Sequence, residues 1–241
     1  MNHRVRSSVR LFTAALAVPI FLAAGCTTSH PAVQIDYTDF VKLGGVTYQA
    51  AWTSPDRPLQ IADLGPVYGK IKVKLEGSQD PNHQLQDGDS AFLGPGTQVY
   101  GVNGYQSTFR LAARHDGRLT LYEADTNPMA KAGADLLDLA NKVHYIGVNS
   151  GSDGHTALAA IKDPNAVKAL VDLVVKSPVD QSNQPGGDIQ YFIDFHMLDG
   201  TEVIRAYWPD AGELSRGINV PGAFKRAIAQ ALGQGLQTPN A

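Results

Sequence analysis

The dipeptide Asp199-Gly200 constrains the fold more than any other feature, because it separates two long β-prone runs at 189–198 and 201–208. Asp-Gly between such runs is typical of a two-residue hairpin turn, since both residues tolerate the positive φ that this turn requires. The chain is therefore expected to contain an antiparallel strand pair here. A turn of two residues would also fix the register of the pair.

In that register Asp194 lies opposite Arg205, and His196 lies opposite Val203. One face of the hairpin would be almost entirely apolar and would pack on the core: Tyr191, Ile193, Phe195, Ile204, Ala206 and Trp208. The other face would carry Phe192, Asp194, His196, Arg205 and Tyr207. We therefore predict that Asp194 and Arg205 are side by side, as a cross-strand ion pair on a polar face.

Residues 142–233 are predicted to form an α+β domain around this hairpin. Strands are expected at 143–148 and 156–161. Asp163-Pro164 is typical of a helix start, with a capping side chain followed by a proline in the first turn, and apolar residues follow at helical spacing up to Pro178. A last helix is expected after Pro221, with Gly233 as its C-terminal cap.

Residues 36–125 are predicted to form a separate β-rich domain, a small barrel or sandwich. A Gly44-Gly45 pair indicates one hairpin, and Ile71, Val73 and Leu75 alternate with lysines in a run at 68–75 that predicts an edge strand. A helix is expected within 127–141, at the boundary of the two halves. The predicted class is thus α+β, with a β-rich N-terminal half followed by an antiparallel sheet with two helices.

The N-terminus has the features of an export signal. Three arginines and no acid occupy residues 1–10, an apolar run fills 11–22, and the small residues 23–25 precede Cys26, the only cysteine. The apolar run is shorter than the ~20 residues of a comfortable membrane-spanning helix.

Leu22-Ala23-Ala24-Gly25-Cys26 resembles the lipobox of bacterial lipoproteins, with Ala23 at a place where leucine is commonest. The resemblance implies that a diacylglycerol is attached to the Cys26 thiol and that residues 1–25 are removed. Residues 26–35 would then be a polar tether, and the chain would be anchored in the cell membrane on its extracytoplasmic side. The alternative is a plain secretory signal followed by an unmodified, buried Cys26.

The body also resembles uncharacterised exported lipoproteins of Gram-positive bacteria. The similar stretches are 191–201, 205–207, 213–218 and 86–100, about a quarter of the chain. This resemblance implies a shared fold and location but no activity.

Composition and motifs exclude several classes of function. A net charge of −3 argues against a partner nucleic acid. The chain has no His-Glu-x-x-His, no nucleophile elbow, no phosphate-binding loop and no dinucleotide fingerprint. The polar segments 80–89 and 149–154 match no complete calcium loop and are interpreted as turns. The sequence therefore predicts no metal site and no cofactor.

The expected function is that of a membrane-anchored binding or interaction module with the lipid bilayer as its partner through Cys26. Its ligand would contact Asp194, His196, Arg205 and Tyr207, the densest polar group on one predicted surface, where Arg205 would bind a carboxylate or phosphate. The alternative is a cell-envelope hydrolase whose carboxylates converge only in the fold, and its candidates are Asp87, Asp89, Asp194 and Asp199. A scaffold that binds no small ligand is the third possibility, and whether the chain is an enzyme stays open.

Overall fold

The computed structural model describes residues 38–51, 58–77, 80, 82–182 and 185–234, which belong to one compact unit, Val33–Ala241. The expected signal peptide, Cys26 and the tether at 26–35 lie outside the described residues. Among the described residues, no helix is both long enough and apolar enough to cross a membrane.

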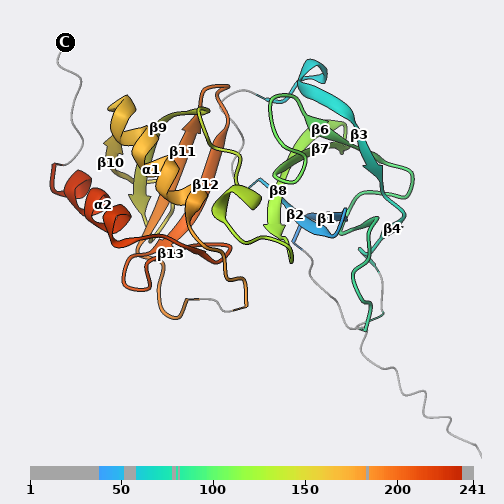
Figure 1. Ribbon diagram of the computed structural model, residues 1–241. Helices are drawn as coiled ribbons and strands as arrows, with labels where there is room; N and C mark the ends of the chain where they lie inside the picture. The colour runs from blue at the N-terminus through green and yellow to red at the C-terminus, as the bar shows by residue number, and fades with distance from the viewer. Residues whose placement is uncertain (1–37, 52–57, 78–79, 81, 183–184, 235–241) are drawn as a thin grey trace, which may run out of the picture. The chain divides into compact units, whose positions relative to one another are not determined.

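The fold is α+β, as predicted, with two sheets and two α-helices (Figure 1). The first sheet contains β1 (Phe40–Leu43), β2 (Val46–Ala50), β3 (Leu64–Lys70), β4 (Val73–Lys74), β5 (Asp89–Ser90), β6 (Gln98–Val102), β7 (Arg110–His115) and β8 (Arg118–Thr126). The second contains β9 (Val143–Ser150), β10 (Ala157–Ile161), β11 (Tyr191–Met197), β12 (Glu202–Trp208), β13 (Glu213–Leu214) and β14 (Ile218–Asn219). The helices are α1 (Pro164–Lys176) and α2 (Gly222–Gln234), and short 3₁₀ helices occupy Ile61–Asp63 and Gly133–Asp135.

The first sheet is curled. Its strand order is β3-β6-β7-β8-β2-β1-β5-β4, so β3 and β4 form its two edges. Only Ile71 and Lys72 connect these edge strands, and the sheet must therefore bend until its edges approach each other. The predicted hairpin at Gly44-Gly45 is confirmed, with both glycines at positive φ between β1 and β2.

Two sequence-based expectations in this half are wrong. The single strand at 68–75 is divided between β3 and β4, because the chain crosses from one edge to the other at Ile71, whose side chain is 2% exposed. The helix at 127–141 is reduced to the 3₁₀ turn at Gly133–Asp135. There the Asp135 carboxylate accepts hydrogen bonds from the backbone N–H groups of Lys131 and Ala132, which stabilises a turn instead of a continuous helix.

The second sheet has the order β10-β9-β11-β12-β13-β14 and is antiparallel throughout. Side chains alternate between its two faces. One face packs against the helices: Ile146, Val148, Ile193 and Phe195 share a core cluster with Val167, Leu170, Val171, Val174 and Phe224. The helix start predicted at Asp163-Pro164 is confirmed, because the Asp163 side chain accepts a hydrogen bond from Ala166 N.

The β11–β12 hairpin is present, but its predicted register is wrong by one residue. The loop has three residues, Leu198 to Gly200, because Gly200 N donates to Met197 O and Met197 N donates to Thr201 O. Gly200 has a φ of 81°, the left-handed conformation that closes a three-residue loop with a bulge. Consequently Asp194 pairs with Ile204, and Arg205 pairs with Ile193.

A shift of one residue moves every side chain of one strand to the opposite face. The predicted pairing of Asp194 with Arg205 is therefore incorrect, and the two residues belong to opposite faces of the hairpin. Glu202 now lies opposite His196, in the place that the two-residue turn would have given to Val203.

Candidate functional site

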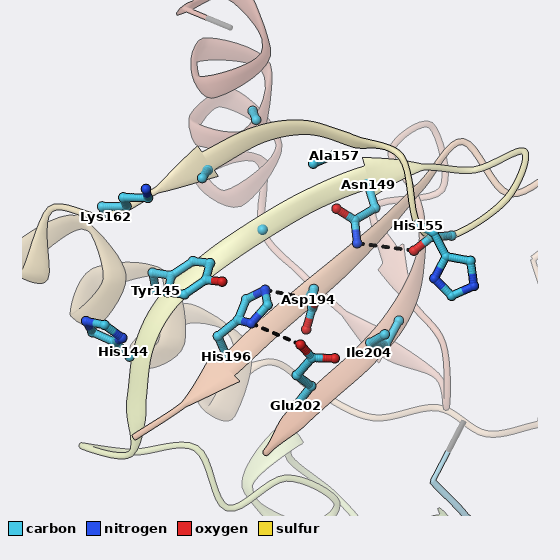
Figure 2. Close-up of a pocket in the computed structure, with 14 residues that line it drawn as sticks. His144, Tyr145, Asn149, His155, Ala157, Lys162, Asp194, His196, Glu202 and Ile204 are labelled. Carbon is cyan, nitrogen blue, oxygen red and sulfur yellow. Dashed lines mark hydrogen bonds and ion pairs between the residues drawn. The ribbon is translucent and has the colours of Figure 1, made fainter. Parts of the chain in front are cut away.

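The face of the second sheet opposite the helices contains a pocket of about 580 Å³ (Figure 2). Its floor is formed by alternate residues of three adjacent strands, as the pleat of a sheet requires. The residues of this floor are Tyr145, Gly147 and Asn149 from β9, Asp194 and His196 from β11, and Glu202 and Ile204 from β12. Backbone hydrogen bonding thus fixes the positions from which these side chains project.

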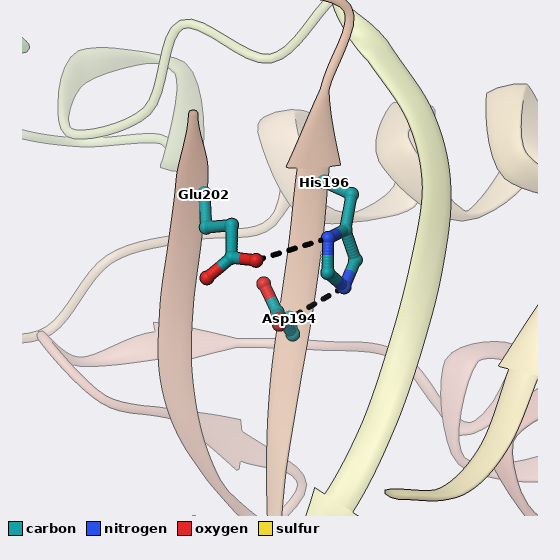
Figure 3. Close-up of side chains that lie close together, drawn as sticks. All are labelled: Asp194, His196 and Glu202. Atoms are coloured by element: carbon teal, nitrogen blue, oxygen red, sulfur yellow. Dashed lines mark ion pairs between the residues drawn. The ribbon is translucent and has the colours of Figure 1, made fainter. Parts of the chain in front are cut away.

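Three ionisable side chains converge on this floor. His196 Nε2 lies 3.0 Å from Asp194 Oδ2, and His196 Nδ1 lies 3.2 Å from Glu202 Oε1. Both carboxylates therefore bind the same imidazole, one at each ring nitrogen, as Figure 3 shows. The side chain of Asp194 is 6% exposed, whereas those of His196 and Glu202 are 19% and 16% exposed.

The neighbouring strand orients the imidazole and leaves space above it. Tyr145 lies directly across from His196, and their rings stack at a centroid distance of 3.9 Å and an angle of 14°. Gly147 lies across from Asp194 and carries no side chain. A methyl group there would approach within 3.5 Å of His196 Nε2, so glycine keeps this part of the floor open to the pocket.

One oxygen of the cluster lacks a partner. Asp194 Oδ1 is buried and has no hydrogen-bond partner among the described residues, although Oδ2 of the same carboxylate contacts His196. Buried polar atoms in native proteins almost always have a partner, so an exception beside a pocket requires an explanation.

The rim of the pocket is polar as well. It includes His144, His155 and Lys162, and the Lys162 ammonium lies 6.0 Å from the centre of the Tyr145 ring. His144 contacts the Tyr145 ring edge-on at 5.5 Å. Asn149 donates a hydrogen bond to Gly154 O and so fixes the turn between β9 and β10 that closes one side of the pocket.

Of the four residues predicted to contact a ligand, the structure places only Asp194 and His196 in this pocket. Arg205 is buried, and its Nη1 binds Glu123 Oε2 of the first sheet at 3.1 Å. Tyr207 is fully buried in the core and packs edge-on against Phe224 at 5.4 Å. The register shift is the cause, because it turns both residues away from the face that carries Asp194.

Sequence reasoning missed Glu202, Tyr145 and Gly147. The signal for Glu202 was the loop length: a three-residue loop closed by Gly200 places Glu202 opposite His196. Tyr145 and Gly147 become neighbours of the cluster only through the pairing of β9 with β11, between strands more than forty residues apart in the sequence.

The other carboxylates considered for hydrolysis lie elsewhere and have local structural contacts. Asp87 accepts a hydrogen bond from Gly45 N at 2.9 Å, and Asp89 binds His83 at 2.7 Å. Asp199 accepts from Thr201 N and Oγ1 and from Tyr105 OH. Its pKa is lowered, because these hydrogen bonds and the nearby Arg110 charge outweigh the effect of burial, which alone would raise it.

Comparisons with protein-family models, with curated proteins and with solved structures find no match to this chain. The chemistry of the site is therefore inferred from its own residues. A buried carboxylate, an imidazole and a second carboxylate in one pocket can bind a polar ligand, coordinate a cation or transfer a proton.

Proposed function

We propose that this chain is a lipid-anchored extracytoplasmic binding module that holds a small polar ligand in the pocket of its second sheet. The observation that carries the proposal is the convergence of Asp194, His196 and Glu202 on the pocket floor. Two paired strands, β11 and β12, carry these side chains, so the site does not depend on loops for its geometry.

The size and lining of the pocket support a small ligand. A volume of about 580 Å³ is within the usual range of small-molecule sites. The apolar lining includes the short side chains of Ala157 and Ala160, while the two carboxylates lie at the floor. This distribution is typical of sites in which a few charged groups orient the ligand.

The sequence supports the anchor. Arg4, Arg6 and Arg10 precede an apolar run of twelve residues, and Cys26 follows three small residues. A diacylglycerol on Cys26 would provide at least two acyl chains, and two chains give durable membrane residence where one gives only marginal binding. The binding domain would then remain at the membrane on its extracytoplasmic side.

The anchor is tested by labelling cells that express the full chain with radioactive palmitate. We expect label in the wild-type protein and its loss in Cys26→Ser, which also leaves the membrane fraction. Thr27→Ser is the matched control and keeps both. Label that persists in Cys26→Ser would contradict the anchor.

Binding is tested by thermal unfolding of the full-length protein, purified in detergent, with a panel of amino acids, dicarboxylic acids and monosaccharides. We expect at least one class to raise Tm in the wild type and to have no effect on His196→Ala. The control is His115→Ala, which removes a histidine paired with Asp39 at 3.3 Å outside the pocket. Equal shifts in wild type and His196→Ala, or no shift with any class, would contradict binding in this pocket.

A cell-envelope hydrolase is the second candidate, and a specific observation favours it. His196 is within hydrogen-bond reach of two carboxylates in a pocket, which is the minimal arrangement for general acid–base catalysis. Asp194 was among the predicted acids, and Glu202 takes the place of the others. Release of nitrophenol from nitrophenyl esters, phosphates or glycosides, abolished in Asp194→Asn, would support hydrolysis over simple binding.

A further inference from the structure

We infer that Asp194, His196 and Glu202 form a binding site for a divalent transition-metal ion such as Zn²⁺. The inference rests on the binding function proposed for the same pocket and names a ligand for it. The sequence alone predicted no metal site, because these three residues show no metal-binding spacing along the chain. The proposed Zn²⁺ site therefore departs from that prediction.

The donor atoms of the three residues favour a first-row transition-metal ion. One imidazole nitrogen and two carboxylate oxygens suit Zn²⁺ and its neighbours in the first transition row, whereas Ca²⁺ and Mg²⁺ prefer oxygen alone. One ligand atom from each residue can be chosen so that all three lie within 4.8 Å of one another. Ligands at ~2.1 Å from a tetrahedral ion are roughly 3.4 Å apart, so side-chain rotations of modest size bring the three donors into range.

The unpartnered oxygen is a separate observation that points to a ligand. Asp194 is 4% exposed, and its Oδ1 has no hydrogen-bond partner among the described residues. In Figure 3 the Asp194 carboxylate is directed toward the space between the His196 ring and the Glu202 carboxylate. A cation in that space would supply the interaction that this buried oxygen lacks.

The local charge favours a divalent cation. With the imidazole in the neutral form that binds a metal, the two carboxylates give the cluster a charge of −2. Lys162, at the rim, is the only lysine or arginine among the residues that line the pocket in the described part of the chain. An ion of charge +2 would neutralise the floor, whereas an anionic ligand alone would face two carboxylates.

Rigid strands preorganise the donors. Asp194 and His196 project from the same face of β11, and Glu202 projects from β12 directly opposite His196. Stacking on Tyr145 limits rotation of the imidazole. Each ring nitrogen already faces a carboxylate, so an ion bound at one nitrogen replaces that ion pair, and both carboxylates lie close enough to contribute an oxygen to it.

The pocket above the cluster gives the ion a further role. Three protein ligands would leave the fourth position of a tetrahedral site open, and all three of these residues line the pocket. A polar solute that enters the pocket would therefore bind the ion through an oxygen or nitrogen atom.

The test is calorimetric titration of the full-length protein, stripped with a chelator in detergent, with ZnCl₂, and with CaCl₂ and MgCl₂ for comparison. We expect one equivalent of Zn²⁺ to bind and the other two ions to bind far more weakly. Asp194→Asn and Glu202→Gln keep the side-chain shape and should each weaken Zn²⁺ binding by about 10–100-fold, and His196→Ala by at least as much. His115→Ala is the matched control and should bind like the wild type.

A second readout is the visible absorption of Co²⁺ in the same site, which should appear in the wild type and disappear in Asp194→Asn. The inference is overturned if no Zn²⁺ binds, or if Asp194→Asn and Glu202→Gln bind it as the wild type does. The two carboxylate variants decide the question even if His196→Ala does not fold. A solute that raises Tm while no Zn²⁺ binds would overturn the metal site alone, whereas Zn²⁺ binding without any solute effect would overturn the solute-binding function alone.

Discussion

The molecule contains two clusters of charged side chains that differ in what their atoms contact. In the first, Glu123 of β8 is buried between Arg110 and Arg205, and both arginines are almost fully buried. In the second, His196 lies between Asp194 and Glu202 on the floor of the pocket. The first cluster connects the two sheets, and its Glu123 and Arg205 also line a second pocket of about 320 Å³. The second cluster lies on the floor of the pocket of about 580 Å³.

Arg110 is a buried charged residue with a structural role. Its Nε and Nη2 bind Glu123 Oε1, its Nη1 binds Thr201 Oγ1 at 2.6 Å, and its Nη2 also binds Glu202 O at 2.8 Å. Tyr105 and Phe109 lie under the guanidinium at 4.7 and 4.9 Å. All three nitrogens have partners, so the cluster holds the β11–β12 hairpin loop to β7.

The comparison indicates that the hydrogen bonds made by Arg110, and not its charge itself, give that residue its structural role. Arg110 has partners at all its nitrogens, whereas Asp194 has a buried oxygen without one in the described structure. The two clusters are also connected, because Arg110 binds the backbone of Glu202, whose side chain belongs to the pocket.

The largest effect is expected from Arg110→Met, which should lower the free energy of unfolding by about 3–5 kcal/mol, because Glu123 would lose its main partner in a buried environment. Arg205→Met should cost no more than about 1–2 kcal/mol, since Glu123 keeps Arg110 and since Nε and Nη2 of Arg205 have no partner among the described residues. Urea unfolding followed by circular dichroism measures both. Equal losses would refute the assignment of Arg110 as the principal partner.

The next effect concerns the pocket cluster. Zn²⁺ at about 100 times its Kd should raise the free energy of unfolding of the wild type by about 2.7 kcal/mol, as expected for a ligand that binds only the folded state. Asp194→Asn, with binding weakened about 10–100-fold, should keep only about 0.4–1.4 kcal/mol of this increment at the same Zn²⁺ concentration, and Arg205→Met should keep all of it. A loss in both variants would show that the two clusters do not act separately.

A smaller change in the free energy of unfolding is expected when the pH is lowered. Burial alone would raise the pKa of Glu123, but the charges and hydrogen bonds of Arg110 and Arg205 outweigh it and lower the pKa below the ordinary 4.5. The stabilisation is therefore fully present above pH 4.5 and is lost as the pH falls through the folded-state value. Urea unfolding between pH 3 and 7 should show this loss in the wild type and a weaker slope in Glu123→Gln. Identical slopes would contradict the role of Glu123.

The smallest loss of stability is expected when Asp163, an exposed carboxylate that caps helix α1, is removed. Asp163 caps α1 through one hydrogen bond to Ala166 N at 2.8 Å. Asp163→Ala should cost about 1 kcal/mol in thermal or urea unfolding, and Asp163→Asn, which can still cap, should cost much less. A loss of stability as large as that of Arg110→Met would contradict the assignment of a single capping hydrogen bond to Asp163.

Features set by short-range chemistry were predictable from the sequence. The hairpin at Gly44-Gly45 depends on two residues that accept positive φ, and the start of α1 depends on Asp163 and Pro164. The helix expected at 127–141 failed for the opposite reason, because its fully buried residues Leu136 and Leu139 belong to a core cluster that includes side chains from both sheets. Tertiary packing there overrides local helix propensity.

The candidate site was predictable only in part. Asp194 and His196 were found because they alternate along one strand, which the sequence shows directly. Glu202 was missed because a loop of three residues was taken for a loop of two, and Arg205 and Tyr207 were misplaced by the same error. Tyr145 and Gly147 depend on long-range strand pairing, which neither hydrophobic periodicity nor turn residues specify.

The three-residue loop at Leu198 to Gly200 has an evolutionary consequence. A single-codon deletion in it would slide β12 by one residue and bring Arg205 beside Asp194, while Glu202 would be turned toward the interior. The same strand would then present Val203 in place of Glu202 opposite His196, and Arg205 in place of Ile204 opposite Asp194, without any substitution in β11 or β12. The length of this loop therefore determines which side chains of β12 face the pocket, and with them the charge that a ligand meets there.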